Sequence, residues 1–148
     1  MEATVPAGYR LSFDPAELQL EVIHSYLSRS YWSPGIPLHA VATAVRNSLT
    51  VAVFNGAGAQ VAFARMVTDH ASFGYLADVF VLAPHQGKGL GHAMVQALLE
   101  LPEVKGMRTL LLLTRDAHGL YQDCGFQRVQ DPSHFMQIRR PGNYPPAP

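Results

Sequence analysis

Three glycines fall within five residues after a predicted strand, and this spacing is suited to binding phosphate. The apolar run 79–82 leads into a turn that contains Gly87, Gly89 and Gly91, and an amphipathic helix follows at once. Glycine lets the backbone turn sharply and brings its amides close to an anion. The unpaired N–H groups and the dipole at the start of the helix then favour a phosphate. Lys88 adds a positive charge at the rim.

Two common phosphate-binding motifs do not fit this glycine loop (residues 86–91). A P-loop requires Gly-x-x-x-x-Gly-Lys-Ser/Thr, and no window of the sequence supplies it. A dinucleotide fingerprint requires Gly-x-Gly-x-x-Gly, but its third glycine would fall on His92 or Met94. A strand-to-helix turn that uses glycine only for its geometry remains the alternative interpretation.

The elements that must position the loop follow from hydrophobic periodicity and from turn and capping residues. Four helices are predicted. The first follows Asp14, which caps a Pro-Ala-Glu start, and the second lies around 38–45. The third begins at about Gly89, and the fourth extends from a cap at Asp116 to Gly125. Strands are predicted at Tyr9 to Phe13, Leu49 to Phe54, Gln60 to Thr68, Phe73 to Leu82, Thr109 to Thr114 and Phe135 to Arg139. The order β-α-α-β-β-β-α-β-α-β predicts an α/β (α+β) fold with one mixed central sheet flanked by helices.

The composition and net charge of the chain indicate which kinds of binding partner to expect. The 148 residues are expected to form a single domain, 1–148, with an extended proline-rich tail from about residue 141. The formal net charge is zero, which disfavours nucleic acid or a membrane as a partner. A single cysteine, Cys124, and the lack of a secretory signal or a long apolar run favour a cytoplasmic protein. The histidines lack metal-ligand spacing, so no metal is expected.

The pattern Gln86-x-x-Gly89-x-Gly91 resembles motif A of the GCN5-related N-acetyltransferase (GNAT) superfamily, Gln/Arg-x-x-Gly-x-Gly/Ala. The order of the elements from Tyr9 to about Ile138 is also that of the family. The resemblance implies a GNAT-like fold and a role for acetyl-CoA as cosubstrate; a homodimer is also compatible with it. Its implied contacts are backbone groups of Phe80 and Val81 for pantetheine and the acetyl carbonyl, and the loop residues Gln86, Gly87, Lys88, Gly89, Leu90 and Gly91 for the pyrophosphate.

A second segment, with Leu120-Tyr121 on a predicted helix and Gly125-Phe126 after it, resembles motif B of the same family. The resemblance places Tyr121 on the tyrosine that commonly protonates the departing thiolate, and a phenol with an ordinary pKa of about 10 can do so. A core aromatic on a short helix is the alternative role. Many family members carry an asparagine at Thr114 that contacts the pantetheine arm, and a threonine hydroxyl is shorter.

Attack by an amine on a thioester also requires a group that removes a proton from the amine. Asp78 is the first candidate, because it lies in an apolar strand and is predicted to share a face with Leu76 and Phe80. A structural carboxylate, or one that binds a cationic amine, is equally consistent with this position. His118, three residues before Tyr121, is a weaker candidate.

The loop at residues 30–37, between the first two predicted helices, contains Tyr31 and the only tryptophan, Trp32. Because this region commonly shapes the acceptor pocket in the family, both side chains are expected to line it, unless they cover the core. The predicted function is acetyl transfer from acetyl-CoA to a primary amine of a small molecule by direct attack. A protein or peptide N-acetyltransferase with an open acidic groove, and a non-catalytic acetyl-CoA sensor, remain alternatives.

Overall fold

The computed structural model of the protein describes residues 4–140, 142, 144 and 146–148. Residues 1–3, and positions 141, 143 and 145 of the expected tail, lie outside the described residues. One sheet contains β1 (Tyr9–Ser12), β2 (Leu49–Asn55), β3 (Gln60–Thr68), β4 (Phe73–Val81) and β5 (Thr109–Leu112). The strands lie in chain order, antiparallel except for the parallel pair β4–β5. The predicted mixed α/β fold is confirmed.

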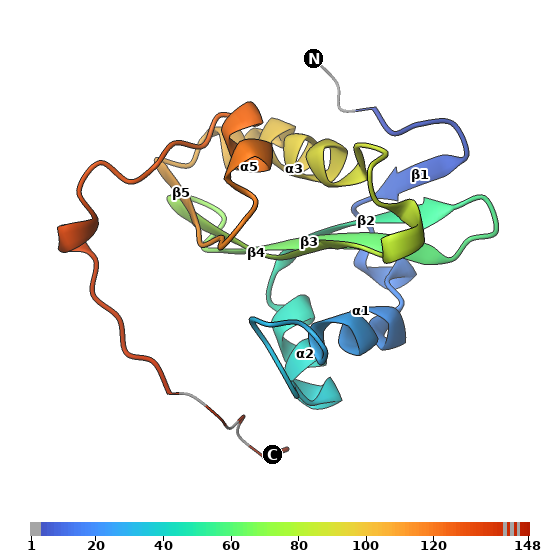
Figure 1. The fold of residues 1–148 in the computed structure, drawn as a ribbon, viewed down its shortest axis with the longest axis horizontal. Coiled ribbons are helices and arrows are strands. Elements are labelled where there is room, and N and C mark those ends of the chain that lie inside the picture. The colour runs from blue at the N-terminus through green and yellow to red at the C-terminus, as the bar shows by residue number, and fades with distance from the viewer. Residues whose placement is uncertain (1–3, 141, 143, 145) are drawn as a thin grey trace.

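Helices cover both faces of this sheet (Figure 1). On one face lie α1 (Leu20–Leu27) and α2 (Leu38–Arg46), and on the other lie α3 (Leu90–Glu100) and α5 (His118–Asp123). The short α4 (Pro102–Lys105) follows α3 directly, and single 3₁₀ turns occur at Pro15–Glu17, Ala83–His85 and Pro132–His134. No helix within the described ranges has the length and apolar character needed to cross a bilayer.

Each face of the sheet has its own hydrophobic core, because successive side chains of a strand point to opposite faces. In β3, Ala62 and Ala64 pack in the core beneath α3, whereas Phe63 packs against α1 and α2. The buried Leu98 of α3 and Ile23 of α1 belong to these two separate cores. The strands β2 and β3 are mostly buried between these two cores, and they hold the neighbouring β4 in place.

A one-residue bulge interrupts β4 at Asp78. Phe63 lies opposite Phe80, and Arg65 lies opposite Ala77. Between these two pairs β4 contains one more residue than β3. Asp78 has φ = 55°, in the left-handed region that non-glycine residues rarely adopt. An inserted residue in a strand moves every later side chain to the other face.

The expectation that Asp78 shares a face with Leu76 and Phe80 is therefore wrong. Leu76 is buried in the core beneath α3, and Phe80 is buried in the core against α1 and α2. The side chain of Asp78 contacts Trp32 and Arg65. The bulge thus directs the carboxylate toward the loop between α1 and α2.

Beyond this bulge the sheet opens. The strand β5 pairs only with the first part of β4, from Phe73 to Leu76. Along the rest of β4, from Ala77 to Val81, the edge that faces away from β3 has no strand partner among the described residues. Backbone groups and side chains at this opening are consequently available to a ligand.

Three details differ from the prediction. The C-terminal segment (residues 135–139), predicted as a final strand, forms no strand, because no neighbouring strand pairs with it in the described chain. Asp116 does not cap α5; instead Thr114 Oγ1 accepts a hydrogen bond from the Ala117 amide at 3.0 Å. Asp14 caps only the 3₁₀ turn Pro15–Glu17, and α1 begins later, at Leu20.

Candidate active site

The glycine loop forms the exposed connection from β4 to α3. Gly87 and Gly89 have φ values of 78° and 81°, and Gly89 is the N-cap of α3. A Cβ atom at either position would meet no atom within 4 Å, so the space beside this backbone is open. Among the described residues, the amides at 87–91 have no protein acceptor. The loop can therefore offer backbone donors to an anion at a helix N-terminus.

Gly91 lies where the start of α3 meets α5 and β4. A Cβ atom there would lie 3.7 Å from Leu120 of α5 and 3.8 Å from Val81 of β4, which is ordinary van der Waals contact. The N-terminal end of α3 is therefore beside the helix that carries Tyr121.

Two side chains brace the glycine loop from within the protein. Gln86 Nε2 donates a hydrogen bond of 2.9 Å to the Val81 carbonyl, which ties the loop back to the end of β4. The Tyr9 hydroxyl lies 2.7 Å from Nδ1 of His85, which links β1 to the turn just before the loop. Gln86 thus supports the loop, and the role of Tyr9 was not predicted from the sequence.

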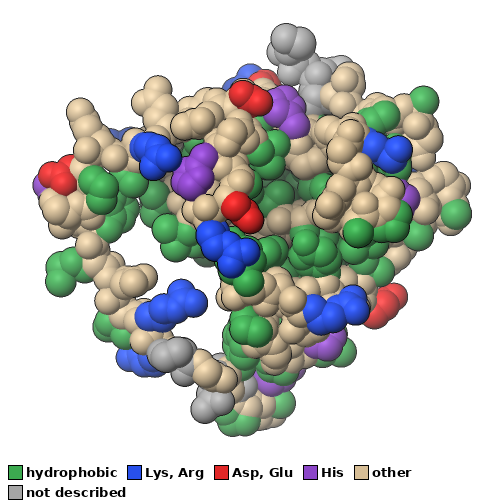
Figure 2. Space-filling view, viewed as in Figure 1, with side chains coloured by type: hydrophobic (Ala, Val, Ile, Leu, Met, Phe, Trp, Pro, Cys, Tyr) green, Lys and Arg blue, Asp and Glu red, His purple; other side chains and the backbone are tan. Residues whose placement is uncertain are grey.

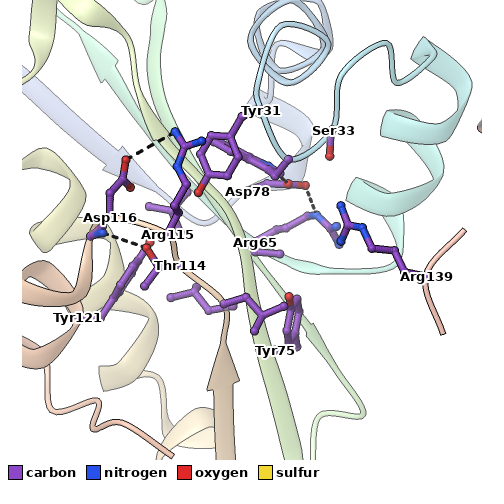
Figure 3. Close-up of a pocket in the computed structure, with 16 residues that line it drawn as sticks. Tyr31, Ser33, Arg65, Tyr75, Asp78, Thr114, Arg115, Asp116, Tyr121 and Arg139 are labelled. Atoms are coloured by element: carbon purple, nitrogen blue, oxygen red, sulfur yellow. Dashed lines mark hydrogen bonds and ion pairs between the residues drawn. The ribbon is translucent and has the colours of Figure 1, made fainter. Parts of the chain in front are cut away.

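A cavity of about 540 Å³ lies where β4 and β5 separate (Figure 3). Its walls come from the loop between α1 and α2, the bulged part of β4, the segment after β5, and α5. Five of the predicted site residues line it together: Tyr31, Trp32, Asp78, Thr114 and Tyr121. The glycine loop is not among the lining residues, so the predicted phosphate site and the predicted chemical site are adjacent but separate.

Each oxygen of the Asp78 carboxylate accepts a hydrogen bond from one donor. Trp32 Nε1 donates to Oδ1 at 2.8 Å, and Arg65 Nε donates to Oδ2 at 2.6 Å. The Asp78 side chain is only 8% exposed and that of Arg65 is 18% exposed, so this pair is shielded from solvent. Arg65 also donates through Nη1 to the Ser48 hydroxyl at 3.1 Å. Any proton transfer through Asp78 must compete with these contacts.

Tyr121 lies at the base of the pocket, on α5. Its ring packs edge-on against Phe126, with 6.1 Å between the ring centroids. Burial raises the pKa of Tyr121 to about 12, and nearby Tyr31, Cys124 and Asp116 add smaller contributions in the same direction. The phenol is therefore protonated at neutral pH, as an acid that donates a proton must be.

The outer wall of the pocket contains Tyr31 and Arg115. The Arg115 guanidinium lies 3.7 Å from the Tyr31 ring centroid, a cation–π contact between the loop after α1 and the segment after β5. Tyr31 also packs edge-on against Trp32, with 5.0 Å between their centroids. This aromatic wall spans the opening between β4 and β5, above Tyr121 (Figure 3).

The remaining predicted cofactor residues belong to the frame of the site. Phe80 is buried, and its ring stacks on Tyr26 of α1 at 4.1 Å, which leaves only its backbone for a ligand. Val81 presents its backbone on the open edge of β4, where Gln86 already occupies its carbonyl. The oxygen of the Thr114 hydroxyl accepts the Ala117 amide.

Three arginines of the pocket were not predicted from the sequence. Arg65, Arg115 and Arg139 line it, against the two acidic residues Asp78 and Asp116. The hairpin between β3 and β4 could have revealed Arg65, since pairing of Thr68 with Gly74 brings it opposite Ala77, next to Asp78. No comparable pattern in the sequence indicates that Arg115 or Arg139 would line the pocket. Within the described ranges, no cluster of three or more His, Cys, Asp or Glu side chains is arranged to hold a metal ion.

Comparison with known proteins identifies the family. Residues 46–128 match the sequence model of the acetyltransferase (GNAT) domain. A protein from Gibberella zeae that is named as an acetyltransferase is 36% identical over 133 residues, which cover 76% of this chain and 75% of that protein.

Solved structures agree with this match. One from Xanthomonas campestris pv. campestris, assigned to the GNAT family, has a TM-score of 0.88 and 40% identity, covering 94% of this chain and 97% of that one. Another, an acetyltransferase from Clostridium acetobutylicum solved with acetyl-CoA, shares the fold, with a TM-score of 0.63 and 14% identity over 88% and 94% of the two chains. The chain belongs to the GNAT family of acetyltransferases.

Proposed function

We propose that this protein transfers the acetyl group of acetyl-CoA directly to a primary amine of a small molecule. The observation that carries the proposal is the convergence of Tyr121, Asp78, Tyr31 and Trp32 on one cavity beside an open glycine loop. Pockets for small ligands usually measure about 300–1,000 Å³. The cavity of about 540 Å³ lies in this range.

The loop and the opening of the sheet supply the cofactor site. The free amides at 87–91, with Lys88 beside them, fit a diphosphate, and the edge of β4 that has no strand partner between Ala77 and Val81 suits an extended amide-containing chain. The acetyl-CoA of the Clostridium acetobutylicum relative supports this choice of cosubstrate. Acetyl-CoA, when bound, supplies the thioester carbonyl that the amine attacks.

The side chains of the pocket have distinct roles in this proposal. Trp32 and Tyr31 hold the acceptor and exclude water from it. Tyr121, kept protonated by burial, donates its phenolic proton to the leaving sulfur. Asp78 accepts the amine proton through a bridging water while Arg65 and Trp32 fix its carboxylate. Holding the reacting groups together accounts for a large share of the rate.

The lining of the pocket favours a small acceptor over a protein. Its aromatic wall contains Tyr31, Trp32, Tyr75 and Tyr121, and its three arginines outnumber its two acidic residues. An enzyme for a basic protein segment would need an acidic groove. Since Arg65 already neutralises Asp78, an amine that also carries a carboxylate suits this pocket better than a polyamine.

A thiol-release screen tests the proposal. Purified protein and acetyl-CoA are mixed with amino acids, arylalkylamines, aminoglycosides, polyamines and peptides, and free coenzyme A is measured. We expect turnover with at least one small amine, fastest among those with an anionic group, and strongly reduced turnover in Tyr121→Phe. Coenzyme binding without thiol release across the whole panel would favour a sensor, and turnover confined to peptides would favour a protein acetyltransferase.

A further inference from the structure

The pocket beside β4 contains one arginine that no carboxylate neutralises. Arg65 is paired with Asp78 at 2.6 Å, and Arg115 has Asp116 within 3.9 Å. Arg139 also lines the pocket, and among the described residues its guanidinium has no ion-pair or hydrogen-bond partner. Three positive charges therefore face two negative ones, and an anionic group on the ligand can neutralise the charge that remains.

Arg139 reaches the pocket from the C-terminal segment, which lies outside the sheet. Figure 2 shows positively charged side chains on both sides of the open space between this segment and the body of the protein. In the close-up, Arg139 lies at the same end of the pocket as Arg65 and Asp78 (Figure 3). Tyr121 lies at the opposite end. The unneutralised charge is therefore beside the carboxylate that the proposed mechanism uses as the base.

Two hydroxyl groups of the pocket are also free to bind a ligand. Ser33 and Tyr75 line the pocket, and neither hydroxyl has a hydrogen-bond partner within the described part of the chain. Burial raises the pKa of the Tyr75 phenol, an effect that Arg65 opposes and Asp78 reinforces, so Tyr75 is a neutral donor near this ion pair. Hydroxyl donors around a guanidinium form a suitable environment for a carboxylate.

The anion that fits at Arg139 belongs to the acceptor and not to coenzyme A. The glycine loop at 86–91, where we propose that the pyrophosphate binds, contributes no residue to the lining of this pocket. The thioester end of the cofactor, which the proposed mechanism places in the pocket, carries no negative charge. A free guanidinium here is consequently a feature of acceptor recognition.

We infer that Arg139 selects the acceptor by binding its carboxylate, and that the acceptor is an α-amino acid. The inference rests on the function proposed above, in which Asp78 lies near the reacting amine. Since Arg139 and Asp78 lie at one end of the pocket, the carboxylate and the amine must be close together, as they are on a single carbon atom. The planar fork of a guanidinium forms two parallel hydrogen bonds with a carboxylate. Tyr31 and Trp32 offer flat apolar surface to a large side chain.

The first test compares amino acids with amines that lack only the carboxylate. Calorimetry measures their binding to the protein with coenzyme A, for the pairs phenylalanine and phenethylamine, tryptophan and tryptamine, and leucine and isoamylamine. In wild type at least one amino acid should bind about tenfold or more tightly than its paired amine, the usual contribution of a hydrogen bond to a charged group. In Arg139→Gln the ratio of the two Kd values should fall to about one.

Arg140→Gln is the matched control. It removes the neighbouring positive charge of the same part of the chain, and Arg140 is not among the residues that line the pocket, so the ratio should remain that of wild type. Arg139→Lys keeps the charge but loses the fork, so its ratio should lie between those of wild type and Arg139→Gln. Because Arg139 is exposed, the melting temperature of Arg139→Gln should match that of wild type.

A second series tests the spacing of the two groups. The α-, β- and γ-aminobutyrates contain the same atoms, but they place the amine progressively farther from the carboxylate. The α isomer should bind most tightly to wild type, and its advantage should shrink in Arg139→Gln. Equal or tighter binding of the γ isomer would contradict the assignment to α-amino acids.

Three further results would overturn the inference. These are a panel in which no amino acid binds more tightly than its paired amine, an Arg139→Gln variant that keeps the wild-type ratio, and an Arg140→Gln variant that loses the ratio equally.

The thiol-release assay separates this inference from the proposed function. Release that is as fast with phenethylamine as with phenylalanine, and likewise within the other pairs, would retain acetyl transfer and contradict the role of Arg139. Binding of amino acids that depends on Arg139, without release of coenzyme A, would support the carboxylate site and contradict the proposed transfer.

Discussion

The indole Nε1 of Trp32 donates a hydrogen bond of 2.8 Å to Oδ1 of Asp78, and this contact joins the loop after α1 to the bulge in β4. Since Arg65 occupies the other carboxylate oxygen, Asp78 holds two walls of the pocket together. The proposed mechanism thus combines positioning and proton transfer in this one side chain. The two roles can be separated by experiment, because they respond differently to isosteric substitution.

Asp78→Asn should reduce both stability and turnover. The amide keeps the size of the carboxylate but removes its charge, which leaves the guanidinium of Arg65, only 18% exposed, without its counter-ion. Loss of one partner from a shielded ion pair costs about 3 kcal/mol of unfolding free energy. Loss of a general base lowers kcat by about 10²-fold or more. Denaturant titration and steady-state kinetics check both effects.

Arg65→Gln is the matched control for that experiment. It breaks the same ion pair from the other side but leaves the carboxylate in place. If it lowers kcat as much as Asp78→Asn does, then Asp78 acts only by positioning its neighbours. A stability of Asp78→Asn equal to wild type would show that the pair contributes nothing to the fold.

Substitutions at Trp32 should act on the acceptor more than on the cofactor. Trp32→Ala removes a wall of the pocket together with a donor to Asp78, so we expect a KM for the amine raised about tenfold or more, with the Kd of coenzyme A nearly unchanged. Trp32→Phe keeps an aromatic ring and removes only the N–H donor, so its effect should be smaller. An unchanged acceptor KM in Trp32→Ala would remove this residue from the acceptor site.

Tyr121→Phe should lower kcat by about 10²–10⁴-fold, the usual contribution of a positioned acid. The ring and its contact with Phe126 remain, so the melting temperature and the Kd of coenzyme A should change little. Tyr31→Phe is the control, since it removes another phenol of the same pocket. Turnover in Tyr121→Phe within twofold of wild type would exclude the proposed acid.

The raised pKa of Tyr121 also predicts how stability depends on pH. Burial holds this pKa at about 12 in the folded protein, above the value of about 10 for an unfolded chain. The resulting stabilisation is complete below pH 10 and is lost as pH rises through about 12. Between these limits wild type should lose more thermal stability than Tyr121→Phe. Parallel melting curves of the two proteins across this range would contradict the assignment.

Gly89→Ala should weaken the binding of coenzyme A, whereas Gly91→Ala should not to the same degree. Gly89 has φ = 81°, so alanine there introduces strain of about 1–2 kcal/mol in the backbone that presents the amides. A Cβ atom at Gly91 meets Leu120 and Val81 only at ordinary contact distance. Calorimetric titration with coenzyme A measures the difference. Equal affinities for Gly89→Ala and wild type would argue against this loop as the phosphate site.

Local patterns were sufficient to predict most of the sheet and the long helices. The strand β3 has the predicted bounds, and β2 and β4 end within one residue of them, because their apolar runs are bounded by clear turns. The C-terminal segment has a strand pattern but no strand, since a strand also requires a neighbouring edge. The four-residue α4, which follows α3 directly, was too short to show a helical period.

The candidate site was only partly predictable for a similar reason. Gly89 was singled out from the spacing of the glycines, and Tyr121 from the resemblance of its segment to motif B. The contact of Arg65 with Asp78 depends on the register of two strands, and a bulge within that register cannot be recognised from alternation alone. Local chemistry is therefore visible in the sequence, whereas its partners depend on pairing across the sheet.

The bulge at Asp78 also makes β4 a strand with two phases. Before it, an even-numbered residue such as Leu76 faces α3, and after it, odd-numbered residues such as Val79 and Val81 do. Without the bulge, the same residues in regular alternation would turn Phe80 toward α3 and Val79 and Val81 away from it. Deleting Asp78 would instead restore a regular strand in which Val79, Phe80 and Val81 keep their present faces. A change of length here would therefore leave the two cores as they are and remove only the carboxylate that Trp32 and Arg65 contact.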